Sequence, residues 1–204
     1  MNDFEKALEI LQANGVILHP TETCYGLACD VFSESALAKI YAIKGRDKGK
    51  PLAILVSDIE MAKEYGVFGD RALGLASRFW PGALSIVVPR TEKLPIFLNS
   101  GEKFVSMRVS SDKFSTDLVK ALGRPIVTTS ANLAGESVMY EVDMRKFEVE
   151  ISGGDSGEVS RRVMAKDLID FVVDGGKIPL NKPSTVVKIE GDRVTVLRQG
   201  EIFI

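Results

Sequence analysis

The chain has 204 residues, of which 45% are apolar and 26% are charged. This length suits one α/β domain over residues 1–204, and the composition excludes a disordered or fibrous protein. Lysine and arginine total 26 against 28 aspartates and glutamates, which gives a formal charge of −2. A uniformly cationic surface for nucleic acid is therefore excluded, so a polyanion would have to bind at a local cluster of basic residues.

Cysteine and histidine are too scarce for a disulfide framework or a histidine-rich metal centre. The two cysteines, Cys24 and Cys29, lie five residues apart, and His19 is the one histidine. We expect both thiols to be reduced. The N-terminus has charged residues at positions 3, 5 and 6 and lacks the apolar run of a signal peptide. No segment reaches the ~20 apolar residues of a membrane span. A cytoplasmic location is the expectation.

Apolar periodicity predicts alternating helices and strands. In the first half of the chain we expect, in order, a helix over 3–14, strands over 16–18 and 25–31, a helix between Ser33 and Gly45, a strand over 52–56, helices over 58–65 and 70–79, and a strand over 84–88. In the second half we expect a strand over 104–109, a helix over 115–122, a strand over 125–129 and an apolar run over 168–173.

The end of the chain decides the fold class. Period-two runs over 185–189 and 193–197 flank Gly191-Asp192, a pattern typical of an antiparallel hairpin. Helices lie between several of the other strands, so the sequence predicts an α/β fold with a mixed, twisted sheet. Residues 141–160 have the weakest pattern and are expected to form a mobile segment or a surface insertion.

Residues 44–50 read Lys-Gly-Arg-Asp-Lys-Gly-Lys, with four cations among seven residues. Basic residues after a helix also satisfy its last carbonyls and its dipole, so a solvated loop is one interpretation. The other is a grip on a triphosphate, in which Arg46 forms paired hydrogen bonds with phosphate oxygens. The P-loop pattern is absent from the chain, so a nucleotide would be held another way.

Small polar residues gather at the expected ends of strands. The segments 128–132 (Thr-Thr-Ser-Ala-Asn) and 21–23 (Thr-Glu-Thr) are either polar turns or sets of donors and acceptors for a small polar substrate. Arg108 lies in an apolar strand, where an arginine needs a partner or a wet cavity. Ser184 and Arg198 lie at the same end of the expected hairpin.

Two further residues are weaker candidates for chemistry. His19 sits in an apolar run beside Pro20, which favours a packed histidine over a catalytic base. Cys24 has no predicted base beside it, which argues against nucleophilic catalysis.

Several ordered motifs together match a known family. The chain resembles the YrdC/YciO-like family of threonylcarbamoyl-AMP synthases through segments 20–27 (PTETCYGL), 44–46 (KGR), 50–52 (KPL), 80–82 (WPG), the Arg108 strand, 129–132 (TSAN), 183–187 (PSTVV) and 197–198 (LR). The resemblance runs from about Gly15 to Ile202. An ordered set of motifs is far more specific than any one of them.

The resemblance implies one YrdC-like domain over 1–204, with helices flanking a twisted mixed sheet and a large concave, electropositive cavity. It implies that L-threonine, bicarbonate and ATP, with Mg²⁺ on the phosphates, give threonylcarbamoyl-adenylate and pyrophosphate. Partner proteins would then use the adenylate for threonylcarbamoyladenosine modification of tRNA. Similar proteins bind RNA, so tRNA or double-stranded RNA is a further implied partner, whereas no membrane is.

The resemblance also implies roles for individual residues. The paired signature that it assigns to catalysis comprises Lys44, Arg46, Ser130 and Asn132. The ATP contacts that it implies are Arg46, Lys50, Ser130 and Arg198. The threonine contacts that it implies are Thr23, Arg108, Thr128 and Ser184. None of the side chains in the catalytic signature is a metal ligand.

The chain departs from the family pattern at several positions. Many relatives have His at position 55, Asn at 50 and Thr at 104, where this chain has Leu55, Lys50 and Phe104. These differences leave other functions open. One alternative is a YciO-like paralogue that binds RNA or a nucleotide without efficient synthase activity, and another is carbamoyl transfer as in hydrogenase maturation.

Overall fold

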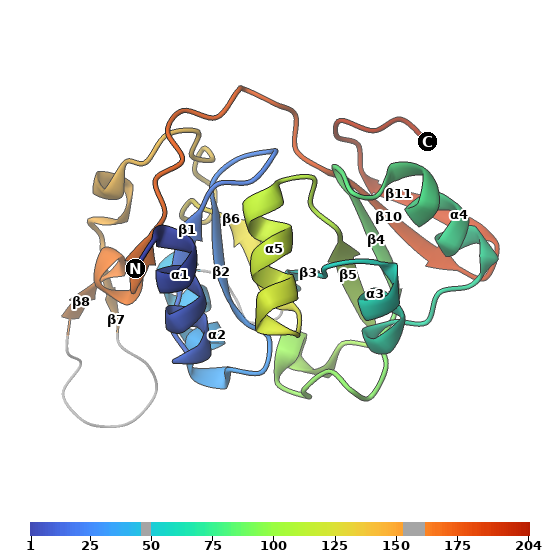
Figure 1. Cartoon of the computed structure of the whole chain (residues 1–204), viewed down its shortest axis with the longest axis horizontal. Helices are drawn as coiled ribbons and strands as arrows, with labels where there is room; N and C mark the ends of the chain where they lie inside the picture. The colour runs from blue at the N-terminus through green and yellow to red at the C-terminus, as the bar shows by residue number, and fades with distance from the viewer. Residues whose placement is uncertain (46–49, 153–161) are drawn as a thin grey trace.

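The computed structural model describes residues 1–45, 50–152 and 162–204 (Figure 1). Five α-helices lie in these ranges: α1 (Asp3–Gln12), α2 (Glu34–Lys44), α3 (Ile59–Tyr65), α4 (Asp70–Phe79) and α5 (Lys113–Leu122). The 3-10 helices in the same ranges are η1 (Leu98–Gly101), η2 (Met144–Phe147) and η3 (Ala165–Leu168).

Nine of the described strands form one sheet. They are β1 (Ile17–His19), β2 (Gly26–Asp30), β3 (Ala53–Leu55), β4 (Leu84–Pro89), β5 (Phe104–Arg108), β6 (Ile126–Ser130), β9 (Phe171–Val172), β10 (Thr185–Glu190) and β11 (Arg193–Arg198). Their order across the sheet is β11-β10-β4-β5-β3-β6-β2-β1-β9. A separate two-stranded ribbon pairs β7 (Glu150–Ser152) with β8 (Arg162–Met164).

The sheet is mixed, as the sequence predicts. The pairs β3–β5, β4–β10 and β1–β9 are parallel, whereas β1–β2, β2–β6 and β4–β5 are antiparallel. The predicted C-terminal hairpin is confirmed, since β10 and β11 pair antiparallel around Gly191, whose positive φ of 60° suits a tight turn.

Local capping explains why both predicted ends of α2 were accurate, whereas α1 ends two residues before its predicted end and α5 begins two residues before its predicted start. At α2 the Ser33 hydroxyl accepts a hydrogen bond from the Ala36 amide at 3.2 Å, and Gly45 ends the helix with a φ of 54°. At α1 Asn2 and Glu5 form a capping box. These contacts are short-range, so the sequence pattern contains them.

Helices cover both faces of the sheet. Figure 1 shows α1 and α5 side by side in front of the strands, where Phe4 and Phe114 make an edge-to-face contact with centroids 5.8 Å apart. Leu118 and Ile126 are fully buried in the smaller core cluster beneath these two helices. The larger cluster fills the opposite face and includes Ile40 of α2. Apolar burial on both faces is the main stabilising contribution to such a layered fold.

Residues 141–152 contain ordered elements that the weak sequence pattern did not predict, at the surface where a surface insertion was one expectation. Residues 144–147 form η2, and Phe147 is fully buried in the larger core cluster. The remaining residues of the expected insertion, 153–160, lie outside the described residues. Within the described ranges every helix is too short or too polar to cross a bilayer.

A buried asparagine fixes the chain where the basic segment enters β3. Asn99 is 3% exposed; its Oδ1 accepts from the Leu52 amide at 2.8 Å, and its Nδ2 donates to the Leu52 carbonyl at 3.0 Å. Asn99 has a φ of 54°, a conformation that asparagine tolerates better than most residues.

We expect Asn99→Ala to lower the free energy of unfolding by about 2–4 kcal/mol, because it leaves two buried backbone groups of Leu52 without partners. Urea denaturation of the variant would measure this. The exposed Gln12→Ala should stay within about 0.5 kcal/mol of the parent protein. Equal losses in the two variants would contradict the role given to Asn99.

Candidate functional site

The strand register places four of the predicted site residues on one face of the sheet. Paired residues on neighbouring strands present their side chains to the same face, and so do residues two apart on one strand. Leu55 is paired with both Arg108 and Ile126, and Thr128 lies two residues beyond Ile126. Arg108, Thr128 and Ser130 therefore share a face, which we call the polar face.

The same argument extends the polar face to the far edge of the sheet. Ser106 is paired with Val87 of β4, and Ser85 is paired with Val186 of β10. Val186 in turn is paired with Arg198 of β11. Arg198 thus lies on the polar face together with Arg108, although β4 and β10 lie between their strands in the sheet.

A lysine holds the loop after β6. Lys44 is 4% exposed, and its Nζ donates to the Ser130 carbonyl (2.6 Å), the Asn132 carbonyl (2.9 Å) and Asn132 Oδ1 (3.0 Å). The Ser130 hydroxyl also donates to Asn132 Oδ1 at 2.6 Å. The structure therefore brings together Lys44, Ser130 and Asn132 of the predicted catalytic set. An ammonium has three N–H groups, so these contacts use the full donor capacity of Lys44.

The Asn132 side chain also makes hydrogen bonds within this loop. Its Nδ2 donates to the Leu133 carbonyl at 2.9 Å and to the Glu136 carbonyl at 2.8 Å. With its Oδ1 accepting from Lys44 and Ser130, the amide is satisfied on both sides. Asn132 therefore fixes the shape of the loop in addition to any contact with a ligand.

Arg108 is buried and has a counter-ion. Its Nη1 donates to Glu22 Oε1, and the Ser110 hydroxyl donates to Glu22 Oε2. The side chains of Arg108 and Glu22 are 7% and 16% exposed. The partner that the sequence demanded for an arginine in an apolar strand is therefore Glu22, from the turn between β1 and β2.

Arg198 is anchored to the start of β10. Its Nε donates to the Ser184 carbonyl at 3.0 Å and its Nη2 to the Ser184 hydroxyl at 2.9 Å, and the Ser85 hydroxyl lies 3.2 Å from that of Ser184. Partial removal from water lowers the pKa of Arg198, and the nearby charge of Arg108 lowers it further. The two guanidinium groups are therefore close enough to interact.

The turn before β2 contributes Thr23 and Cys24. The Thr23 hydroxyl lies 3.1 Å from that of Thr21, and both residues are buried. Burial is the main cause that raises the pKa of the Cys24 thiol; the cations Arg108 and Lys44 oppose this rise and Glu22 adds to it. The half-buried Cys24 thus lies within range of charges from three different segments.

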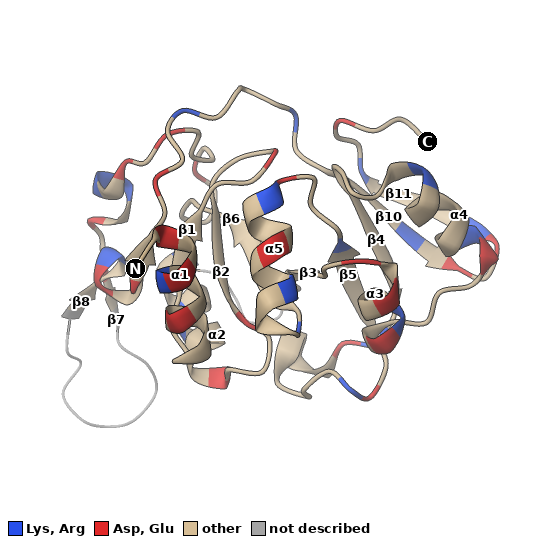
Figure 2. Ribbon diagram, in the orientation of Figure 1, with Lys and Arg blue, Asp and Glu red and all other residues tan. Residues whose placement is uncertain are grey.

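The remaining predicted ATP contacts are less defined. Arg46 lies outside the described residues. Lys50 is exposed and makes no hydrogen bond with another described residue. Acidic and basic residues are interspersed along the helices (Figure 2), so the cations of the polar face are a local feature and not part of a generally basic surface.

The described residues do not form a binding site for a resident metal ion. No group of three or more His, Cys, Asp and Glu side chains among them is placed to hold one. Magnesium prefers oxygen ligands and commonly reaches proteins on the phosphates of a nucleotide.

The two apolar departures have structural roles. Leu55 is fully buried in the smaller core cluster. Phe104 lies under Lys188, whose Nζ is 3.9 Å from the ring centroid. A lysine this close to an aromatic face gains a favourable cation–π interaction.

Sequence reasoning missed Ser110 and Ser85 as members of the site, and it named Glu22 only within the Thr-Glu-Thr segment, without its pairing to Arg108. Ser110 and Ser85 are buried, but no local pattern separates them from exposed serines. Glu22 could have been found by asking which carboxylate balances Arg108, because a buried arginine demands one. Both cysteines are free, as expected.

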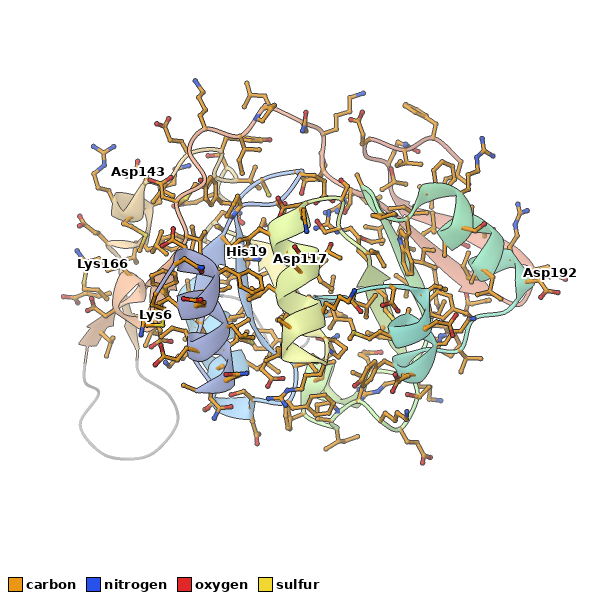
Figure 3. The ribbon with its side chains drawn as sticks, in the orientation of Figure 1. Lys6, His19, Asp117, Asp143, Lys166 and Asp192 are labelled. Carbon is orange, nitrogen blue, oxygen red and sulfur yellow. The ribbon has the colours of Figure 1, made fainter. Side chains whose placement is uncertain are left out.

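The predicted packing of His19 is confirmed. It is fully buried between the sheet and α5 (Figure 3), and its Nδ1 lies 3.3 Å from the Ser115 hydroxyl, which donates to Asp112 Oδ1 at 2.7 Å. Its Nε2 is buried without a partner. Burial lowers the pKa of His19 to about 4.

Comparison with known proteins identifies the family and the fold. The family model Sua5/YciO/YrdC, described as "Telomere recombination", matches residues 9–200. A threonylcarbamoyl-AMP synthase of Thiobacillus denitrificans is 34% identical over 171 residues, which cover 82% of this chain and 89% of the relative.

Two solved structures are similar over nearly the whole chain. Pyrococcus abyssi Sua5 complexed with L-threonine superposes with a TM-score of 0.82 at 26% identity, covering 97% of this chain and 54% of the other. Escherichia coli YciO superposes with a TM-score of 0.78 at 25% identity, covering 97% of this chain and 88% of the other. The chain thus spans about half the length of the Pyrococcus protein.

We expect His19→Phe to remove part of the acid sensitivity of the fold. Folded His19 stays neutral to about pH 4, whereas the unfolded chain takes up a proton below about pH 6.5. The stability that wild type loses between pH 6.5 and 4 should therefore exceed the loss in the variant by about 3 kcal/mol. Urea denaturation across this range would measure the difference.

The single histidine gives an independent readout, because its NMR titration has no overlapping signal. We expect the midpoint of this titration at about pH 4. A midpoint near 6.5, or stability curves that run parallel in the two proteins, would contradict the burial of an uncharged imidazole.

Proposed function

Since the chain belongs to the Sua5/YciO/YrdC family, we propose that it synthesises L-threonylcarbamoyladenylate from L-threonine, bicarbonate and Mg²⁺-bound ATP, with release of pyrophosphate. The adenylate would supply partner proteins that form threonylcarbamoyladenosine in tRNA. One observation carries the proposal: Arg108, Arg198 and Ser130 share one face of the sheet, and Lys44 and Asn132 are hydrogen-bonded to Ser130. Three small reactants need such a convergence to meet.

The cations of the polar face favour the first chemical step. The amine of threonine must lose its proton before its nitrogen bonds to the carbon of CO₂ derived from bicarbonate. Positive charges nearby disfavour the ammonium form and so lower the pKa of the amine. The same charges stabilise the carbamate anion that results. Arg108 is suited to hold the α-carboxylate, because a guanidinium binds carboxylates through paired hydrogen bonds.

The second step transfers the adenylyl group. A carbamate oxygen bonds to the α-phosphorus of ATP, and the bond from that phosphorus to the bridging oxygen breaks, so the electron pair leaves with pyrophosphate. We propose that Arg198, Arg46 and Lys50 bind the phosphates of ATP. Cations there stabilise the charge that moves onto the pyrophosphate leaving group. Lys44 acts through Ser130 and Asn132, because its own N–H groups are already used.

A second candidate is a YciO-like protein that binds RNA or a nucleotide without efficient synthesis. One observation favours it. Leu55 and Phe104 place apolar side chains at positions where the synthases that the sequence resembles carry polar ones.

Pyrophosphate release separates the two candidates. Protein given ATP, Mg²⁺, L-threonine and bicarbonate should release pyrophosphate, and omission of threonine alone should abolish the release. We expect Arg198→Ala to slow turnover by about tenfold or more, because the loss of one charge-assisted contact costs about 1.5–3 kcal/mol. Arg193→Ala, on the same strand but at its far end, is the matched control and should retain full activity.

Pyrophosphate release that does not depend on threonine would exclude the proposed reaction. If no pyrophosphate forms while the protein binds ATP or RNA, the YciO-like candidate stands instead. Equal losses in Arg198→Ala and Arg193→Ala would remove Arg198 from the phosphate site.

A further inference from the structure

Glu22 is fully engaged on one side of Arg108. One carboxylate oxygen accepts from Arg108 Nη1 and the other from the Ser110 hydroxyl. The pair is largely removed from water, with exposed side-chain fractions of 7% for Arg108 and 16% for Glu22. A buried ion pair of this kind is strongly destabilised when one partner is removed.

The backbone that carries Glu22 is also fixed. Asn181 Nδ2 donates to the Glu22 carbonyl at 2.8 Å. Asn181 belongs to the segment that crosses the top of Figure 1 between β9 and β10. Within the turn itself, the Thr21 hydroxyl donates to the Cys24 carbonyl at 2.7 Å and accepts from the Cys24 amide at 3.3 Å. The carboxylate is therefore presented from a rigid support.

The other side of the Arg108 guanidinium is open. Its Nε and Nη2 make no hydrogen bond to a described residue, yet the one fully buried side-chain nitrogen or oxygen without a partner in the described ranges is His19 Nε2. The free N–H groups of Arg108 must therefore reach accessible space. A guanidinium held along one edge presents its remaining donors in a fixed direction.

We propose that Glu22 is the positioning residue of the amino-acid carboxylate subsite, which it forms by holding Arg108 through Nη1 and leaving Nε and Nη2 for the substrate. This inference rests on the proposed function and identifies how the same site selects a carboxylate. Displacement of Glu22 by the substrate is disfavoured, because a carboxylate with both oxygens bonded would be left buried and unpaired.

Glu22 also separates the two anions that the reaction must bind. It neutralises most of the Arg108 charge, so Arg108 recognises a carboxylate chiefly by geometry. Arg198 bonds only to neutral groups of Ser184 and has no carboxylate partner among the residues that the structure describes. The uncompensated charge is therefore at Arg198, where a polyphosphate gains most from it.

Separate titrations of L-threonine and ATP by calorimetry test the inference. In Glu22→Gln the affinity for L-threonine should fall about tenfold or more while that for ATP changes less than about twofold, because the amide keeps the shape but loses the charge that orients Arg108. Glu60→Gln, at an exposed i,i+3 pair with Lys63, is the matched control and should change neither affinity. Unchanged or tighter threonine binding, or equal weakening of both ligands, would overturn the inference.

Ser110→Ala covers the case in which Glu22→Gln does not fold. It keeps the ion pair but frees one carboxylate oxygen, so we expect threonine affinity to fall about threefold with ATP binding unaffected. Wild-type threonine binding in Ser110→Ala would then count against the positioning role.

The thiol of Cys24 reports the same ion pair without any substrate. Arg108 and Lys44 lower its pKa and Glu22 raises it, so the pH dependence of iodoacetamide alkylation should shift to lower pH in Glu22→Gln and stay unchanged in Glu60→Gln. Cys29 is fully buried, so modification of Cys24 can be followed separately by mass spectrometry. An unshifted profile would overturn the charge pairing.

Failure of the proposed function would look different. If the wild-type protein binds another L-amino acid in place of threonine, and that binding depends on Glu22, the threonine assignment fails and the positioning role of Glu22 holds. If no L-amino acid binds, both fail.

Discussion

The need to balance one buried charge connects the two halves of the sheet. Arg108 is at the end of β5, and burial of its guanidinium without a counter-ion would cost several kcal/mol. Glu22 supplies that counter-ion from the turn between β1 and β2, 86 residues away in the chain. Ser110 and Asn181 then tie this turn to two more segments. The ion pair therefore helps to set the position of the turn, and with it Thr23 and Cys24, together with these hydrogen bonds.

The cations of the polar face differ in how much of their bonding capacity the protein itself uses. Lys44 gives three hydrogen bonds to the loop after β6 and so acts as a fixed support. Arg108 is held along one edge, and Arg198 contacts only the neutral groups of Ser184. For the proposed reaction this difference matters, because a carboxylate and a polyphosphate would bind side by side and each would need its own cation.

Sequence reasoning succeeded where the determining contact is local. The ends of α2 follow from Ser33 and Gly45, and the C-terminal hairpin follows from Gly191-Asp192. It failed where distant segments meet: η2 was missed because Phe147 is buried by tertiary packing and not by a helical repeat, and the role of Asn99 depends on Leu52, 47 residues away. For the site, single motifs left turn and ligand interpretations open, and only the ordered set of motifs selected among them. That set could not identify Glu22 as the partner of Arg108.

The apolar residue at position 55 supports the same ion pair. Leu55 is the direct neighbour of Arg108 across the β3–β5 pairing, on the same face, and it is fully buried in the cluster that includes Leu118 of α5. An apolar, fully packed neighbour keeps this part of the face dry. In low-dielectric surroundings the attraction between Arg108 and Glu22 is stronger than it would be beside a hydrated polar residue. The same leucine that departs from the pattern of the synthases is thus compatible with a strong buried ion pair one strand away.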